Sequence, residues 1–363
     1  MLPFARPEIS DYEIEAVAGV LKSGLLSTGI RVSHFEQCFA RAVGARQAVA
    51  VDSATNGLYL SLVASGITSG EVITTPWTFT ATAEAIERAG CTPRFVDIDP
   101  VTLNFDLDLV AEAINENTRA ILPVHMAGLA VNLTQLYELA KKHNLVIIED
   151  AAHALGSKHM GKPIGSFKKS AATVFSFYAT KPLCTGEGGM ICTGDDALAA
   201  RLRRLRLHGI TRTDDWEYEV TDCGIKANMT DLEAAIGSVQ LRRYQTMQAR
   251  RKAFAEYYLE AFNELELVLP AVGMDEHSWH LFVVQVKNRN PFIKAMRQHG
   301  IQCGVHYKPL HLHKYWSEKY NLTPDSLPKA TAIFQQNVSL PLYSAMTIKD
   351  VNHVSAVVIK LLT

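Results

Sequence analysis

Short apolar runs alternate with helical stretches along the first half of the chain. From about residue 47, runs typical of buried strands are each followed by about 10 to 15 residues with helical spacing. This alternation is typical of βαβ units, in which helices cover both faces of a parallel sheet. The pattern therefore predicts an α/β fold with a large, mainly parallel sheet sandwiched by helices. The predicted strands are 48–53, 71–76, 92–99, 119–125, 145–153, 172–178 and 188–194, and the predicted helices are 55–66, 79–90, 107–117, 133–143 and 196–209.

The last part of the chain has a different pattern. Residues 210–224 are polar and irregular, which predicts a surface loop, and a long helical pattern runs over 228–262. We expect a large domain over 1–245, with an N-terminal segment, and a smaller C-terminal α+β domain over 246–363. The elements predicted for the smaller domain are strand 278–286, helix 292–300, strand 303–307 and helix 350–362.

Composition and charge exclude several functional classes. The 363 residues are 48% hydrophobic and 20% charged, and the formal net charge is −1. Without a basic field we expect no nucleic-acid partner, and no segment has the roughly 20 apolar residues that a membrane span requires. The N-terminus lacks the features of a signal peptide, and the six cysteines are scattered without a C-x-x-C pair. We therefore expect reduced thiols in a cytoplasmic protein.

Two acid–base candidates end the apolar strand pattern at 145–153. Asp150 lies at the carboxyl edge of the predicted sheet, where ligands of α/β proteins collect. Its carboxylate can meet a ligand there, or it can cap the helical residues that follow. His153 lies one turn further on, and by itself it is better explained as a hydrogen-bonded structural histidine than as a catalyst.

Two loops carry further candidates. Residues 52–58, "DSATNGL", join a strand to a helix with small side chains, so that backbone N–H groups can approach an anion closely. Neither a G-x-G-x-x-G fingerprint nor a P-loop occurs in the chain. Trp77 follows a proline at the end of a strand, where it can lie against a planar ring or belong to the core.

Lys181 stands in "FSFYATKPLCTGEGGM", residues 175–190, where a strand gives way to a glycine-rich turn. Most single lysines are solvated surface groups, and a nucleophilic lysine needs surroundings that lower its pKa from about 10.4. Here an anion-binding turn, an aromatic ring, a carboxylate and this lysine follow one another at successive strand ends. Pyridoxal phosphate needs such a set, for its phosphate, its ring, its pyridine nitrogen and its aldehyde respectively. The sequence therefore predicts a pyridoxal phosphate site.

Eight segments are similar, in order, to those of the DegT/DnrJ/StrS family of sugar aminotransferases. They are "GLLSTG", "DSATNGL", "TPWTFTATAEAI", "FVDIDPVTLN", "ILPVHMAG", "VIIEDAAHALGS", "FSFYATKPLCTGEGGM" and "ANMTDLEAAIGSVQL". The resemblance covers essentially the whole chain. It implies the type I aminotransferase fold, bound pyridoxal phosphate, and a homodimer whose active sites are built at the subunit interface.

The resemblance also assigns roles to individual residues. Lys181 resembles the lysine that forms a Schiff base with the cofactor, Asp150 the partner of the pyridine nitrogen, and Trp77 the ring that stacks on the cofactor. The family places a residue near the phenolic oxygen of the cofactor at the position of His153.

Further residues resemble the phosphate ligands of the family. Ala54 and Thr55 occupy the phosphate turn, where Ala54 replaces a common glycine, and Ser176 is similar to the phosphate-binding serine. Asn228 resembles an asparagine that reaches the phosphate of the neighbouring subunit. Lys226 and Arg212 are candidates for the diphosphate of a sugar nucleotide.

The motifs around Asp150 and Lys181 resemble the branch of the family that acts on 4-keto sugars. "GVHYKPLHLHKYW", residues 304–316, resembles the same branch, and we expect His306 and Tyr307 to contact the substrate. His306, His311 and His313 lack matching carboxylate or cysteine spacing, so we expect no metal site.

These features predict a transaminase that moves an amino group from L-glutamate to a nucleotide-linked 4-keto-6-deoxy sugar. The products would be a 4-amino-4,6-dideoxy sugar nucleotide and 2-oxoglutarate, with pyridoxamine phosphate formed between the two halves. One alternative is a 3-keto sugar or keto-cyclitol aminotransferase on the same fold, and another is a non-catalytic regulatory protein that keeps the fold. A nicotinamide oxidoreductase is disfavoured because the glycine fingerprint is missing.

Overall fold

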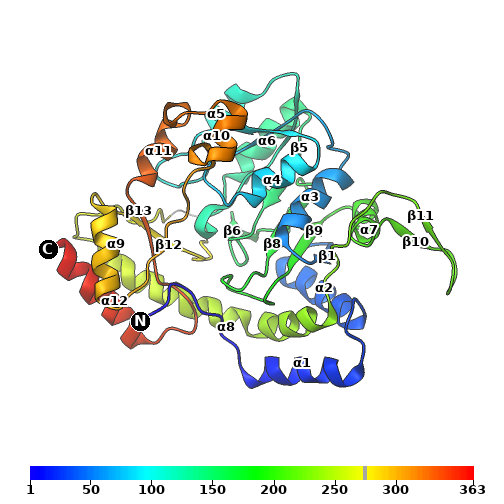
Figure 1. Cartoon of the computed structure of the whole chain (residues 1–363), viewed down its shortest axis with the longest axis horizontal. Helices are drawn as coiled ribbons and strands as arrows, with labels where there is room; N and C mark the ends of the chain where they lie inside the picture. Colours follow the sequence, from blue (N-terminus) through cyan, green and yellow to red (C-terminus); the bar gives the residue numbers. More distant parts are fainter. Residues whose placement is uncertain (273–275) are drawn as a thin grey trace.

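A computed structural model describes residues 1–272 and 276–363 of the chain. Its main sheet contains β1 (Gln47–Val51), β2 (Glu71–Thr74), β3 (Thr92–Phe95), β4 (Thr118–Ile121), β5 (Val146–Asp150), β8 (Ala172–Ser176) and β9 (Gly189–Thr193). The strand order is β1-β9-β8-β5-β4-β2-β3, and β9 is antiparallel to both of its neighbours while the other pairs are parallel. The predicted α/β architecture with a mainly parallel sheet is confirmed (Figure 1).

Helices cover both faces of this sheet. They are α2 (Ile30–Val43), α3 (Ala54–Ala64), α4 (Ala81–Arg88), α5 (Leu107–Ala113), α6 (Leu133–His143), α7 (Asp196–Leu205) and the first half of α8 (Asp231–Ala261). Helices α3, α4 and α7 pack on one face, and α2, α5, α6 and α8 pack on the other. Along β1 the side chains alternate between the two cores, since Ala48 and Ala50 face one and Val49 and Val51 face the other.

A smaller sheet lies at the other end of α8. Strands β12 (Phe282–Gln285) and β13 (Asn337–Leu340) pair antiparallel and share a core with α9 (Arg289–Gln298), α12 (Ile348–Leu362) and the last turns of α8. The predicted boundary at residues 245 and 246 falls inside α8, which runs through both parts (Figure 1). The domain limits stay a prediction.

The segment between β12 and β13 in sequence returns to the large sheet. It contains η2 (Leu310–Leu312), α10 (Lys314–Tyr320), η3 (Pro324–Ser326) and α11 (Pro328–Phe334). Trp316 of α10 packs with Ala83 of α4, and its ring meets that of Phe95 of β3 edge to face. Part of the predicted C-terminal domain is therefore a cover for the edge of the large sheet.

Two predicted elements differ from the structure. Residues 210–224 contain a hairpin of β10 (Ile210–Arg212) and β11 (Tyr218–Val220) that projects from the body of the molecule (Figure 1). Because the side chains of this hairpin are largely exposed on both faces, the sequence has no apolar alternation to reveal it. The strand predicted over 303–307 is wrong, since within the described ranges these residues form a single bridge, between Gly304 and Ser339.

Four further elements have not yet been named. They are α1 (Asp11–Ser23), β6 (Lys158–His159), β7 (Lys162–Pro163) and η1 (Met126–Gly128). In the part of the chain that the structure describes, no helix combines the length and the hydropathy needed to cross a bilayer.

Candidate active site

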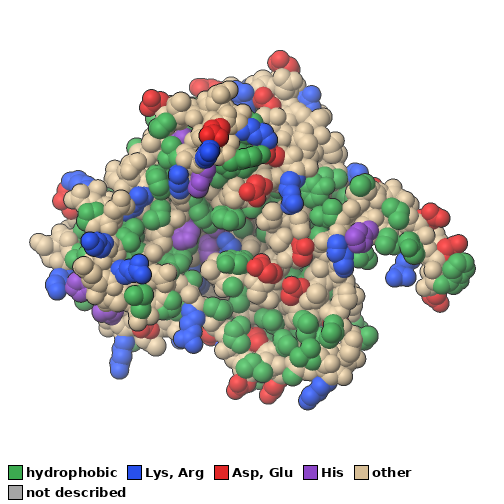
Figure 2. Space-filling model, viewed as in Figure 1, with side chains coloured by type: hydrophobic (Ala, Val, Ile, Leu, Met, Phe, Trp, Pro, Cys, Tyr) green, Lys and Arg blue, Asp and Glu red, His purple; other side chains and the backbone are tan. Residues whose placement is uncertain are grey.

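A cavity of about 500 Å³ opens where the carboxyl ends of β5 and β8 meet the start of α3. Its lining includes Asp150, His153, Ser176, Lys181, His306 and Tyr307, all of them named by the sequence. They come from widely separated segments, and the sheet brings them together because parallel strands end at the same edge. On the face shown in Figure 2, histidine side chains gather in the hollow at the centre of the molecule.

Asp150 is the last residue of β5, and its carboxylate is held from two sides. Oδ2 accepts a hydrogen bond from Thr82 Oγ1 at 2.8 Å, and Oδ1 accepts one from the backbone N–H of Ala152 at 3.0 Å. Thr82 is itself 2.7 Å from Thr78 Oγ1. Burial raises the pKa of Asp150, while these hydrogen bonds and the charge of Lys181 act in the opposite direction. The result is a fixed carboxylate that a cation in the cavity would stabilise.

Lys181 lies in the turn after β8, where its backbone N–H donates to the carbonyl of Tyr178 at 2.8 Å. Burial lowers the pKa of its amine from 10.5 to about 8, although the nearby Asp150 favours the charged form. A substantial share of the amine is then neutral near physiological pH. Lys181 can therefore act as a nucleophile and as a base.

One end of the cavity is built to hold an anion. Helix α3 begins at Ala54, and its cap Ser53 accepts a hydrogen bond from the N–H of Asn56 at 3.2 Å. Ala54, Thr55 and Ser176 line the cavity beside this helix start. The backbone of Gly189 passes so close that a Cβ there would lie 2.7 Å from Ala54 N. Free N–H groups, a hydroxyl and a close glycine suit a phosphate.

The expectation for Trp77 is wrong. Its side chain is fully buried in a core cluster with Ile98 and Met126, away from the cavity. Phe79, two residues later, is 61% exposed and lines the cavity, with its ring 6.2 Å from that of Tyr307. The sequence offered two aromatics two positions apart, and only the packing of β2 and α4 decides which one faces the ligand. Phe79 is the candidate to stack on a planar ring.

His153 and His306, beside the cavity, are neutral, and each forms a hydrogen bond with a neighbouring side chain. His153 Nε2 lies 3.0 Å from the hydroxyl of Tyr307, and His306 Nδ1 lies 2.8 Å from Ser339 Oγ. Burial lowers the pKa of His306 to about 4 and that of His153 well below its ordinary value. His280, which sequence reasoning missed because it sits in an apolar strand pattern, has its ring 4.3 Å from that of His153.

Besides Trp77, three predicted residues lie outside this cavity. Arg212 is on the exposed strand β10, and Lys226 contacts the side-chain oxygen of Asn228. Asn228 in turn donates from Nδ2 to Thr28 Oγ1 at 2.5 Å. Their predicted roles, including contact with the neighbouring subunit, stay predictions.

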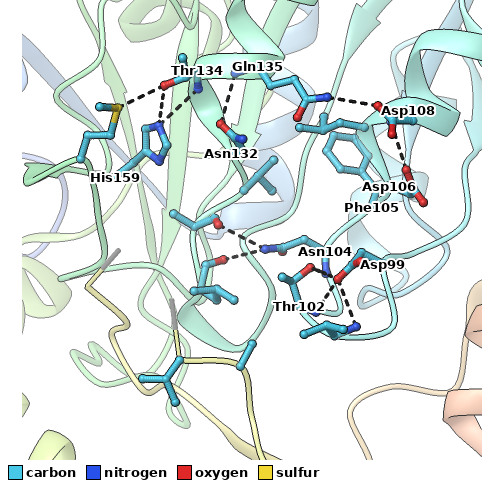
Figure 3. A pocket seen from close by; sticks show the side chains of 18 residues that line it. Asp99, Thr102, Asn104, Phe105, Asp106, Asp108, Asn132, Thr134, Gln135 and His159 are labelled. Carbon is cyan, nitrogen blue, oxygen red and sulfur yellow. Dashed lines mark hydrogen bonds between the residues drawn. The ribbon is translucent and has the colours of Figure 1, made fainter. Parts of the chain in front are cut away.

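A larger hollow of about 1060 Å³ lies elsewhere, between the loop before α5 and the start of α6 (Figure 3). Its carboxylates are engaged by their own surroundings. Asp99 Oδ1 accepts from the N–H of Thr102 at 2.7 Å, Asp106 caps α5, and Asp108 accepts from Gln135. Across the described residues, no three His, Cys, Asp or Glu side chains are grouped to hold a metal ion. Size alone does not make this hollow the site.

Comparison with known proteins identifies the chemistry. The model of the DegT/DnrJ/EryC1/StrS aminotransferase family matches residues 7–359. The chain is 42% identical to the spore coat polysaccharide biosynthesis protein SpsC of Bacillus subtilis over 371 aligned positions, covering 97% of this chain and 95% of that protein.

The chain is also similar to solved structures over essentially its full length. PseC of Helicobacter pylori, an aminotransferase involved in the biosynthesis of pseudoaminic acid, has a TM-score of 0.94 and 30% identity, and the match covers 99% of this chain and 98% of PseC. Spr1654 of Streptococcus pneumoniae matches over 100% of both chains in two forms. Its PMP form has a TM-score of 0.94 and 31% identity, and its PLP form has a TM-score of 0.93 and 32% identity.

The cavity fits pyridoxal phosphate on its own chemistry. The start of α3 and Ser176 suit the phosphate, the buried Asp150 suits a protonated pyridine nitrogen, and Lys181 can reach an aldehyde as a neutral amine. With the type I aminotransferase fold and this cofactor, the chain belongs to the DegT/DnrJ/EryC1/StrS aminotransferase family and is a pyridoxal phosphate-dependent enzyme.

Proposed function

We propose that the enzyme moves an amino group from L-glutamate to a nucleotide-linked 4-keto-6-deoxy sugar. The products are a 4-amino-4,6-dideoxy sugar nucleotide and 2-oxoglutarate. The observation that carries the proposal is the convergence of Lys181, Asp150 and the start of α3 on one buried cavity. A sugar substrate is supported by SpsC, a polysaccharide biosynthesis protein, and by PseC, an aminotransferase in pseudoaminic acid biosynthesis.

The residues of the chain divide the work. Pyridoxal phosphate, when bound, supplies an electron-withdrawing ring and carries the amino group as pyridoxamine phosphate between the two half-reactions. Asp150 holds the proton on the pyridine nitrogen. In the glutamate half-reaction Lys181 would accept a proton from the α-carbon of the amino acid and deliver it to the C4′ carbon of the cofactor, and in the sugar half-reaction it would move a proton in the reverse direction, onto the sugar carbon. His306 and Tyr307 face the same cavity and contact the sugar.

A homodimer is part of the proposal. Apolar side chains of α1 and the loop after it are exposed, and they gather at the lower edge of the molecule in Figure 2. They include Tyr12, Ile14, Leu21 and Leu25, and Ile30 at the start of α2 is exposed as well. We propose that a second copy covers this surface, that Asn228 reaches the cofactor phosphate of the neighbouring subunit, and that Lys226 and Arg212 meet the diphosphate of the sugar nucleotide.

We further propose that the enzyme works in the cytoplasm. All six cysteines lie in the described part of the chain, and none of them forms a disulfide bond. Free thiols are usual in a reducing compartment. Nucleotide sugars, the proposed substrates, would be available to the enzyme there.

A substrate panel tests the sugar assignment. Purified enzyme with pyridoxal phosphate and L-glutamate is given 4-keto-6-deoxy and 3-keto nucleotide sugars side by side, with Lys181→Ala as the inactive control. We expect 2-oxoglutarate and an amine at C-4, identified by mass and NMR, only with the 4-keto sugars. Amination of the 3-keto sugars instead, or of neither class, contradicts the proposal.

A further inference from the structure

The position of one histidine proton can be derived from a backbone contact. The N–H of Ala127 lies 3.3 Å from Nδ1 of His153, and a backbone N–H can only donate. Nδ1 must therefore carry a lone pair. Because burial and the charge of Lys181 keep the pKa of His153 well below its ordinary value, the ring is neutral and its single proton is on Nε2.

The same proton sets the direction of the next hydrogen bond. Nε2 lies 3.0 Å from the hydroxyl oxygen of Tyr307, so His153 donates and Tyr307 accepts. Burial and Asp150 raise the pKa of Tyr307, which keeps its hydroxyl protonated. Its proton cannot point at His153, and among residues 1–272 and 276–363 the hydroxyl forms no hydrogen bond other than the one with His153. Tyr307 lines the cavity that holds Lys181.

The backbone N–H of Ala127, the first donor in this series of hydrogen bonds, is held firmly. Ala127 lies in a left-handed turn with φ 56°, and the N–H before it, of Met126, donates to Asn104 Oδ1 at 2.9 Å. The amide of Asn104 also donates to two carbonyls after the turn, as drawn in Figure 3. On the other side, the carbonyl of Gly128 accepts from the N–H of Ser278 at 3.0 Å. The turn is clamped from both sides, so the N–H of Ala127 has a fixed direction.

We propose that Tyr307 donates its hydroxyl proton in a hydrogen bond to an oxygen of the sugar at or next to the carbonyl carbon, with His153 as the positioning residue that fixes this direction. The inference rests on the proposed function, because it assumes that a keto sugar fills this part of the cavity. A carbonyl or neighbouring hydroxyl oxygen can accept such a bond. The contact would select substrates that carry an acceptor oxygen there.

Half-reaction kinetics separate this role from a role toward the cofactor. Tyr307→Phe is compared with Tyr258→Phe, a buried phenol that donates to the carbonyl of Pro341 in the small-sheet core. The probes are L-glutamate for the first half-reaction and a uridine-diphosphate-linked 4-keto-6-deoxy sugar for the second. We expect Tyr307→Phe to slow only the sugar half, by roughly 10- to 100-fold, the usual effect of leaving one buried acceptor unpaired. Equal slowing of both halves, or of neither, overturns the proposal.

A matched pair of variants tests the positioning role. His153→Gln keeps an amide donor at the place of Nε2, whereas His153→Asn keeps an acceptor for Ala127 but has no donor that reaches Tyr307. We expect the sugar half-reaction to be retained better in the glutamine variant, by a lower KM or a higher kcat or both. Equal activities, or the reverse order, contradict the role of the Nε2 proton.

A structural readout needs no substrate. Neutron diffraction of the deuterated holoenzyme should show deuterium on Nε2 of His153, none on Nδ1, and the Tyr307 hydroxyl deuterium directed into the cavity. Deuterium on Nδ1, or a Tyr307 deuterium directed at His153, overturns the inference. The neutron result can hold while the parent enzyme fails to turn over the keto sugar. In that case the proposed substrate is wrong, but the direction of the hydrogen bond between His153 and Tyr307 is confirmed.

Discussion

Burial shifts the pKa values of Lys181 and Asp150 in opposite directions, because it disfavours the charged form of each residue. It lowers the pKa of the lysine and raises that of the carboxylate, while the attraction between the two charges partly restores both. For Lys181 the balance leaves a pKa of about 8, so that about half of the amine is neutral at that pH. An ordinary surface lysine would be almost entirely protonated there.

The pH dependence of cofactor capture follows from this balance. In protein freed of pyridoxal phosphate, the rate at which Lys181 binds added cofactor should rise with pH through about 8 and then level off, because the neutral amine is the nucleophile. The rate is measured by the growth of visible absorbance between pH 6 and 10. Lys181→Met should show no such absorbance. A rate that is still rising steeply at pH 10 would mean that the amine is not desolvated.

Among the elements, α3 and β9 are packed closely enough to determine the phosphate site. Gly57 of α3 faces Val174 of β8 and Ile191 of β9, with room for no side chain. At Gly189 the start of α3 comes closer still, since a Cβ would lie 2.7 Å from Ala54 N. The small residues thus place the free N–H groups of the helix start directly at the strand ends.

Adding one methyl group to this contact should weaken cofactor binding. Gly189→Ala must push the start of α3 away, and we expect the affinity for pyridoxal phosphate to fall by roughly tenfold or more, the effect of one lost hydrogen bond to a charged group. Titration of cofactor-free protein measures the affinity. Gly194→Ala, just beyond β9 where the nearest atoms belong to Lys168 and lie 3.3 Å away or more, is the matched control. Equal affinities in the two variants would show that α3 does not hold the phosphate.

At the scale of the whole molecule, α1 is attached to the body through the buried Glu13 and Val20. Gln240 and Arg243 of α8 donate to Glu13 of α1, at 2.8 and 2.7 Å. The apolar residues of α1 and its following loop are left outside, among them Ile14 and Leu25, which are 61% and 69% exposed. Exposed apolar side chains gathered on one surface indicate a partner surface.

Charges on that surface should separate the proposed dimer. The double variant Ile14→Glu/Leu25→Glu should sediment as a monomer at micromolar concentration and lose most of its activity, because the site would lack the residues of the neighbour. Ile348→Glu, which alters an exposed apolar residue at the start of α12, is the control and should remain dimeric. A variant that stays dimeric, or a monomer with full activity, rejects this surface or the shared site.

The cavity was predicted from sequence as far as its residues follow strand ends. Asp150 and Lys181 could be named because one ends an apolar strand and the other lies in the turn that follows one, and strand position is a local pattern. Thr82 and His280 could not be named, since one is an ordinary helix residue and the other lies beside an apolar strand. Both reach the cavity region only through packing between distant segments.

The sequence by itself determined the alternation of strands and helices, and with it the parallel sheet, the edge where ligands collect and the lysine and aspartate found there. These depend on the periodicity of neighbouring residues, which the chain carries locally. Only the tertiary structure decided that Phe79 rather than Trp77 faces the cavity, that residues 310–334 return to cover the large sheet, and that the proton of Tyr307 points inward. Each of these depends on which surfaces are buried against each other, and burial is settled by segments far apart in the chain.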